Sequence, residues 1–153
     1  ISVHVLGIFE PVMDLHPELF FFTPLIAAMA GNVGVQSSAI IVQGLANNTI
    51  IGPVVERLLK ELSLSLLNGV ILSVILLAGS YFLLGYEIHV GYTVAIALLS
   101  VIIMASLIGT FIPIILNKYG VDPALATGPF ITTSNDILGI LTYFTIAKII
   151  LGI

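Results

Sequence analysis

The sequence predicts an all-α integral membrane protein, organised as a single transmembrane domain over residues 1–153 with five membrane-spanning helices. Three observations lead to this prediction. Hydrophobic residues make up 59% of the chain and charged residues only 8%, whereas soluble domains carry about 25% charged residues. The apolar residues form long runs that short polar connections separate. The last run contains one carboxylate, Asp136, and a carboxylate deep in a membrane indicates a functional site.

The first two segments are short. Residues 1–9 are apolar, but as a helix they extend only about 13 Å, less than half of the ~30 Å hydrocarbon core. We interpret them as the outer end of a truncated first helix, and the chain as a fragment of a longer protein. Residues 10–18 predict a loop in which Glu10, Asp14 and Glu18 recur every four residues. Two interpretations stay open, a solvated connection or an acidic mouth that concentrates cations.

Residues 19–46 predict the second span, because an apolar run of this length can cross the hydrocarbon core. Asn32, Gln36 and Gln43 share one face of the expected helix. Such amides either hold helices together through hydrogen bonds or line a pore, and the sequence leaves both interpretations open.

Two further spans are expected at residues 62–84 and 92–116. The first of them is rich in Leu and Ile and should face mainly lipid. Residues 47–61, which precede it, predict a polar connection because they contain Pro53 and several charged residues. Residues 85–91 predict a short turn between the two spans.

The fifth span is expected to open at Asp122 and Pro123, because Asp at an N-cap followed by Pro is a strong helix start. Asp136 then lies about 21 Å along the helix, near the middle of the hydrocarbon core. Gly128, Thr132 and Asp136 are spaced at one helical turn and share a face. Insertion scales assign a central Asp roughly 2.5–3.5 kcal/mol, which favours a functional role for Asp136.

The basic residues predict the orientation. Five spans place residues 47–61 and 117–122 on the same side of the membrane, and these connections hold Arg57, Lys60 and Lys118. The positive-inside rule makes this side cytoplasmic. We therefore expect a protein of the plasma (cell inner) membrane with its N-terminus in the cytoplasm and its C-terminus outside.

The donor atoms expected around Asp136 are carboxylate, hydroxyl, amide and carbonyl oxygens, and the sequence contains no Cys. Hard cations prefer such donors. Mg²⁺ keeps most of its waters and needs only one or two carboxylates, and a symmetric homodimer would bring two Asp136 side chains to one axis. Coupling to H⁺ or Na⁺ stays equally open. The net charge of −4 and the lack of a basic run argue against a nucleic-acid partner.

Two motifs resemble the MgtE family of magnesium channels. Residues 30–38 read Ala-Gly-Asn-Val-Gly-Val-Gln-Ser-Ser, with Gly-Leu-Ala at 44–46, and are similar to the second membrane helix of that family. Residues 128–139 read Gly-Pro-Phe-Ile-Thr-Thr-Ser-Asn-Asp-Ile-Leu-Gly and are similar to its fifth helix. The resemblance covers nearly the whole chain in order, and the pair of motifs is far more specific than either alone.

The resemblance implies a homodimeric channel in the lipid bilayer that moves hydrated Mg²⁺ through a pore between the subunits. The residues expected to hold the metal are Asp136, Thr132 and Gly128, the last through its backbone alone. The residues expected to line or shape the pore are Asn32, Gln36, Thr133 and Asp122. Relatives usually carry cytoplasmic regulatory domains before the first helix, and we expect such domains to lie outside this sequence.

The sequence leaves alternatives open for the transported ion and for the function. Mn²⁺, Co²⁺ or Ca²⁺ could occupy the same site as Mg²⁺. An H⁺- or Na⁺-coupled secondary transporter of divalent cations would use Asp136 as its protonatable group, although paired broken helices and an internal repeat are not evident in the sequence. A membrane anchor without transport activity is a third possibility. All three are functions of a protein that is not an enzyme.

Overall fold

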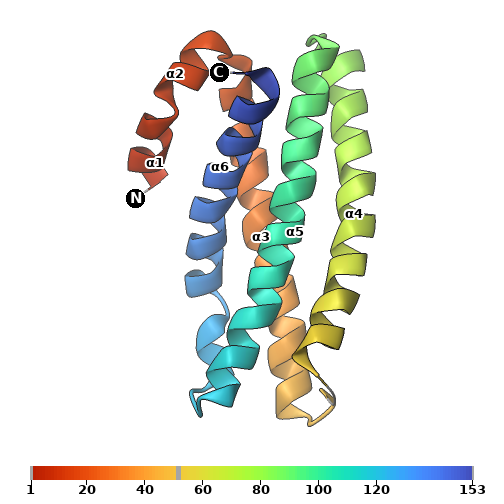
Figure 1. The fold of residues 1–153 in the computed structure, drawn as a ribbon, viewed down its shortest axis with the longest axis vertical. Coiled ribbons are helices and arrows are strands. Elements are labelled where there is room, and N and C mark those ends of the chain that lie inside the picture. Colours follow the sequence, from red (N-terminus) through yellow and green to blue (C-terminus); the bar gives the residue numbers. More distant parts are fainter. Residues whose placement is uncertain (1, 51–52, 153) are drawn as a thin grey trace.

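Four long helices run side by side along the molecule, and two short helices lie beside one end of them (Figure 1). The computed structural model describes residues 2–50 and 53–152, and the elements of these residues are all helical, as the sequence predicts. In chain order they are α1 (Ser2–Ile8), α2 (Glu10–Leu15), α3 (Glu18–Ala46), α4 (Val54–Phe82), α5 (Ile88–Lys118), the 3-10 helix η1 (Pro123–Ala126) and α6 (Pro129–Leu151).

The four long helices are each long and apolar enough to cross a membrane. The shortest, α6, has 23 residues and extends about 35 Å, more than the ~30 Å hydrocarbon core. Helix α1 has 7 residues and falls well short of that thickness. The described residues thus contain four candidate spans, and the fifth span of the expected topology remains a prediction.

Two segments that were predicted to be non-helical connections are partly helical, so these two predictions were wrong. Residues 10–18 contain α2, whose second residue, Pro11, stands where a helix does not need its N–H. The second half of residues 47–61 is also helical, because α4 begins at Val54. Charge was the misleading signal, since Glu61 at the end of this stretch is a buried helical residue.

The expected start of the last helix was also wrong, because α6 begins at Pro129 and not at Asp122. Asp122 caps η1 instead, where its Oδ1 accepts a hydrogen bond of 2.9 Å from the N–H of Ala124. Gly128 then adopts a φ of 63°, which favours glycine, and separates η1 from α6. Asp136 therefore lies only about 10 Å along α6, and no single helix connects it to Asp122.

Helix α5 is the centre of the bundle and packs against α3, α4 and α6, while α3 also packs against α6 and α1 packs on α6. Close backbone approach holds α5 to α3, since a Cβ at Gly109 would lie 2.4 Å from the carbonyl oxygen of Gly34. The Tyr143 hydroxyl of α6 donates a buried hydrogen bond of 2.9 Å to the Leu19 carbonyl of α3. Small residues and a few polar bonds thus join the helices.

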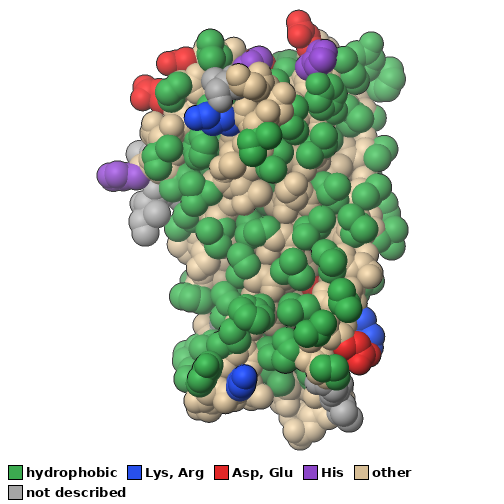
Figure 2. Space-filling model, viewed as in Figure 1, with side chains coloured by type: hydrophobic (Ala, Val, Ile, Leu, Met, Phe, Trp, Pro, Cys, Tyr) green, Lys and Arg blue, Asp and Glu red, His purple; other side chains and the backbone are tan. Residues whose placement is uncertain are grey.

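Helix α4 exposes its apolar residues and buries its polar and small ones. Its exposed side chains include Leu64, Leu66, Leu67, Val70, Ile71, Val74 and Ile75. Its buried residues are Glu61, Ser65, Gly69, Ser73 and Ser80. Helices in a bilayer associate through small residues, so this pattern agrees with the lipid-facing span expected here. Figure 2 shows apolar side chains along the length of one face, with most charged side chains toward its two ends.

Candidate cation site on α6

The start of α6 places the predicted metal-binding residues along one side of the helix. The carbonyl of Gly128 accepts hydrogen bonds from the N–H of Thr132 at 3.0 Å and from its hydroxyl at 3.1 Å. Thr132 precedes Asp136 by one turn, so their side chains project on the same face of α6. Both are half-buried, which leaves the Asp136 carboxylate at the edge of the bundle and accessible from outside the chain.

Helix α3 lies against this face of α6 at Gly31. A Cβ at Gly31 would lie 2.7 Å from Oδ1 of Asp136 and 3.2 Å from Cγ2 of Thr132. Only a residue without a Cβ lets the carboxylate approach the α3 backbone this closely. Gly31 of the 30–38 motif and Asp136 of the 128–139 motif therefore lie next to each other.

A fully buried amide, Asn135, lies next to Asp136 and was not among the expected site residues. Its exposed fraction is 0%, and a Cβ at Gly34 would lie 1.8 Å from its Nδ2. Neither polar atom of the Asn135 side chain has a hydrogen-bond partner in residues 2–50 and 53–152. An unpaired buried amide costs about 1–3 kcal/mol, so Asn135 marks a polar position inside the bundle beside the carboxylate.

The Asp136 carboxylate has no basic partner in the described part of the chain. The contacts found there between acidic and basic side chains are a hydrogen bond of 2.8 Å between His16 and Glu18 and an ion pair of 2.9 Å between Lys60 and Glu56. The same residues contain no group of three or more His, Asp or Glu side chains suited to hold a metal ion. One chain therefore offers a cation a single carboxylate at this position, together with hydroxyl and carbonyl oxygens.

Two of the expected pore residues lie on another side of α3. Asn32 and Gln36 are exposed and line a groove between α3 and α4, together with Glu61. Thr133 is also exposed, and Asp122 is the exposed cap of η1. Within one chain, Thr132 lies one turn and Gly128 two turns before Asp136 on the same side of α6, whereas no contact joins Asp136 to Asn32, Gln36 or Asp122 in the described residues.

The three acids of the expected mouth lie at one end of the bundle. Glu10 and Asp14 are exposed residues of α2. Glu18, the first residue of α3, is half-buried and bonded to His16. The acids are thus arranged on consecutive short elements, and whether they gather cations stays a prediction.

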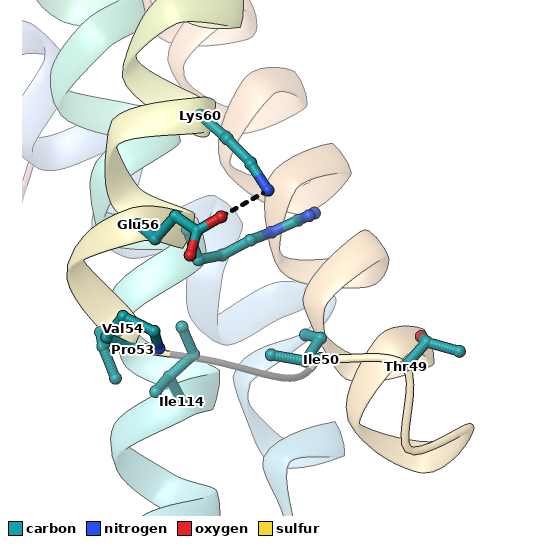
Figure 3. Close-up of a pocket in the computed structure, with 8 residues that line it drawn as sticks. Thr49, Ile50, Pro53, Val54, Glu56, Lys60 and Ile114 are labelled. Carbon is teal, nitrogen blue, oxygen red and sulfur yellow. Dashed lines mark ion pairs between the residues drawn. The ribbon is translucent and has the colours of Figure 1, made fainter.

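The opposite end of the bundle carries the connection from α3 to α4. Figure 3 shows the side chains of Glu56 and Lys60 meeting on α4, beside a pocket that Thr49 and Ile50 of this connection also line. Both partners are more than half exposed, at 57% and 64%, so solvent screens their attraction and the pair contributes little to stability. Lys60 is therefore engaged with an acid of its own helix and does not neutralise a buried one.

Comparison with known proteins connects these features to one family. A family profile, MgtE, described as "Divalent cation transporter", matches residues 23–146, which include both motifs. The chain is 39% identical over 148 residues to the magnesium transporter MgtE of Bacillus subtilis, covering 96% of this chain and 33% of the relative.

Two further relatives carry the same name. The magnesium transporter MgtE of Thermus thermophilus is 32% identical over 152 residues, covering 99% of this chain and 33% of the relative. That of Enterococcus faecalis is 36% identical over 143 residues, covering 92% and 31%. The chain thus spans about a third of the length of these relatives, and the resemblance expected from the two motifs is confirmed.

Proposed function

The chain belongs to the MgtE family of divalent cation transporters, and from this premise we propose that it moves hydrated Mg²⁺ across the membrane through a pore between the subunits of a homodimer. The family consists of transporters and not of enzymes, as predicted. The observation that carries the proposal is the carboxylate of Asp136, which lies on an apolar helix, against Gly31 of α3 and without a basic partner in the described residues. A cation is the partner that this carboxylate lacks.

The donor set at Asp136 favours a hydrated Mg²⁺. Each chain contributes one carboxylate, with the Thr132 hydroxyl and the Gly128 carbonyl one and two turns earlier. Both of these oxygens already share a hydrogen bond, so they are better placed to contact water than to replace it. Mg²⁺ gives up its waters reluctantly and is commonly held through one or two carboxylates, which two copies of Asp136 would supply.

The incompleteness of the site in one chain supports a dimer. The half-buried Asp136 and the exposed Thr133 leave polar groups at the surface of α6, where a second copy would cover them. In this arrangement α3 and α6 line the pore, and Asn32 and Gln36, which lie on the groove side of α3, support the pore-lining helix without binding the transported ion. Thr133 extends the lining along α6.

The ends of the bundle support an orientation. Arg57, Lys60 and Lys118 belong to the end that holds the connection from α3 to α4 and the start of η1 (Figure 1), and positive charge favours the cytoplasmic side. Asp122 would then lie at the cytoplasmic mouth. The acidic residues Glu10, Asp14 and Glu18 would lie at the outer mouth, and five spans would leave the N-terminus in the cytoplasm and the C-terminus outside.

The test is Mg²⁺ uptake into liposomes that contain the purified protein, with Asp136→Asn compared with the unsubstituted protein. The substitution keeps the size of the side chain and removes its charge. A hydrogen bond to a charged group contributes about 1.5–3 kcal/mol, so losing the charge should weaken ion binding about tenfold or more per carboxylate. Uptake should fall accordingly, while the protein should elute from a sizing column as before.

Glu56→Gln is the matched control, because Glu56 is exposed and paired with Lys60. Its uptake should equal that of the unsubstituted protein. Unchanged uptake by a folded Asp136→Asn would remove Asp136 from the mechanism. Uptake that requires a pH or Na⁺ gradient would replace the channel by a coupled transporter.

A further inference from the structure

Glu61 is a second carboxylate within the bundle, about two turns after the start of its helix at Val54. It belongs to α4 and is only 7% exposed. Its Oε1 accepts a hydrogen bond of 2.6 Å from the Ser37 hydroxyl of α3 and one of 2.9 Å from the Ser106 hydroxyl of α5. The two hydroxyl oxygens are 3.3 Å apart. One carboxylate oxygen is thus held by donors from two other helices.

Glu61 lacks a basic partner among the residues that the structure describes. Lys60 is paired with Glu56 on the outer face of α4. Arg57, one turn before Glu61, instead lines the small cavities at the connection from α3 to α4, and it forms no ion pair in the described part of the chain. A buried carboxylate without a countercharge is strongly unfavourable, and two hydroxyl donors compensate only part of its lost hydration.

A groove between α3 and α4 adjoins this carboxylate. Its volume is about 450 Å³, and Glu61, Ser37 and Ser106 form part of its wall. The amide side chains of Asn32, Gln36 and Asn68 also line it. Six waters occupy about 180 Å³ at ~30 Å³ each, so the groove can hold an ion with a full first shell of water.

We propose that Glu61, with Ser37 and Ser106, forms a second cation site, which takes a hydrated divalent cation such as Mg²⁺ in the groove between α3 and α4. The cation supplies the missing countercharge. The amide oxygens accept hydrogen bonds from its waters, and the amide N–H groups donate hydrogen bonds to them. The donors are all oxygen or amide groups, which suits a hard ion that keeps its hydration shell.

This site is separate from the one at Asp136. On α3, Gly31 faces Asp136, whereas Asn32 lines the groove, and successive residues of a helix point about 100° apart. The two carboxylates therefore contact different faces of α3, Asp136 at Gly31 and Glu61 at Ser37. Cation binding at Glu61 does not depend on whether Asp136 binds the transported ion.

The first experiment measures Mg²⁺ binding by isothermal titration calorimetry on the purified protein in lipid nanodiscs. Glu61→Gln keeps the shape of the side chain and one acceptor oxygen for the two serine hydroxyls but removes the charge, and should lose a class of bound Mg²⁺. Glu56→Gln, the exposed acid of the same helix, and Asp136→Asn should both retain that class. A folded Glu61→Gln with the titration of the unsubstituted protein overturns the proposal, whereas loss of binding in Asp136→Asn alone would support only the site on α6.

The second experiment needs no substitution at Glu61, and so decides the matter even if that variant does not fold. An apolar carbodiimide labels buried carboxyl groups, and mass spectrometry reports the labelling rate of Glu61. With Mg²⁺ at about 100 times its Kd, the free fraction of the site falls about 100-fold, so labelling of Glu61 should slow by a similar factor, also in Asp136→Asn. Labelling of Glu61 that Mg²⁺ does not slow refutes the site.

Discussion

Gly34→Ala should destabilise the bundle, because the added methyl group would occupy the position of a buried side chain. A Cβ at Gly34 would lie 1.8 Å from Nδ2 and 2.8 Å from Cγ of Asn135, and 3.2 Å from Cγ2 of Ile131. Both neighbours are 0% exposed, so neither can turn outward to make room. The clash therefore has to be relieved by movement of α3 away from α6.

The expected magnitude is a balance of two effects. Replacing a helical Gly by Ala stabilises by about 0.5–1 kcal/mol, through the lower backbone entropy of the unfolded chain. Overpacking a filled core destabilises by about 1–3 kcal/mol, and the contact at 1.8 Å places this site toward the upper value. The net loss of stability should be about 1–2 kcal/mol.

Thermal denaturation of the purified protein in detergent, followed by size-exclusion chromatography, measures this loss. Gly79→Ala is the matched control, since a Cβ there meets no described atom within 4 Å, and it should be neutral or stabilising. Asn135→Ala combined with Gly34→Ala should recover stability, because the obstructing amide is gone. If Gly34→Ala alone proves as stable as Gly79→Ala, the close packing of α3 on α6 at Asn135 is refuted.

Two further substitutions separate the site from the fold. Gly31→Ala should reduce Mg²⁺ uptake with little loss of thermal stability, because its Cβ would meet Oδ1 of Asp136 at 2.7 Å and this half-buried carboxylate can turn away; normal uptake would contradict the contact. Tyr143→Phe should lower stability by about 1 kcal/mol, because it removes the buried hydrogen bond to the Leu19 carbonyl; an equal effect of Tyr81→Phe, whose ring is exposed, would refute that reason.

Apolar length alone predicted two of the four long helices of the described residues well. The spans expected at residues 19–46 and 92–116 correspond to α3 (Glu18–Ala46) and α5 (Ile88–Lys118). Hydrophobic runs of this length need a helix to satisfy their backbone groups in a bilayer, so the sequence determines them locally. Helices of this kind can therefore be predicted without knowledge of any tertiary contact.

The sequence contains two start signals before the last helix, and the choice between them is not local. Asp122 with Pro123 and Gly128 with Pro129 each place a Pro at a first helical position. The structure uses the first pair for η1 and the second for α6. The extended backbone of Thr127 and the positive φ of Gly128, which the sequence permits but does not require, separate the two helices.

The sequence indicates Asp136 as a candidate site residue, but it does not indicate the residues that surround it. Asp136 stands out in any apolar run because its burial is costly. That Gly31 faces it, and that Asn135 fills the space over Gly34, depends on how α3 crosses α6. These residues lie about a hundred positions apart in the chain, and one sequence carries no information on such a contact.

The burial of Glu61 follows from the way α4 packs. Glu61, Ser65, Gly69 and Ser73 recur every four residues and form one stripe on that helix. The stripe packs tightly, since a Cβ at Gly69 would lie 2.6 Å from Cδ1 of Leu99 on α5. Lipid solvates leucine as well as another helix does, so small and polar residues mark the packed face. Glu61 continues that face at its end, and this is why a charged residue that resembles part of a connection lies inside the bundle.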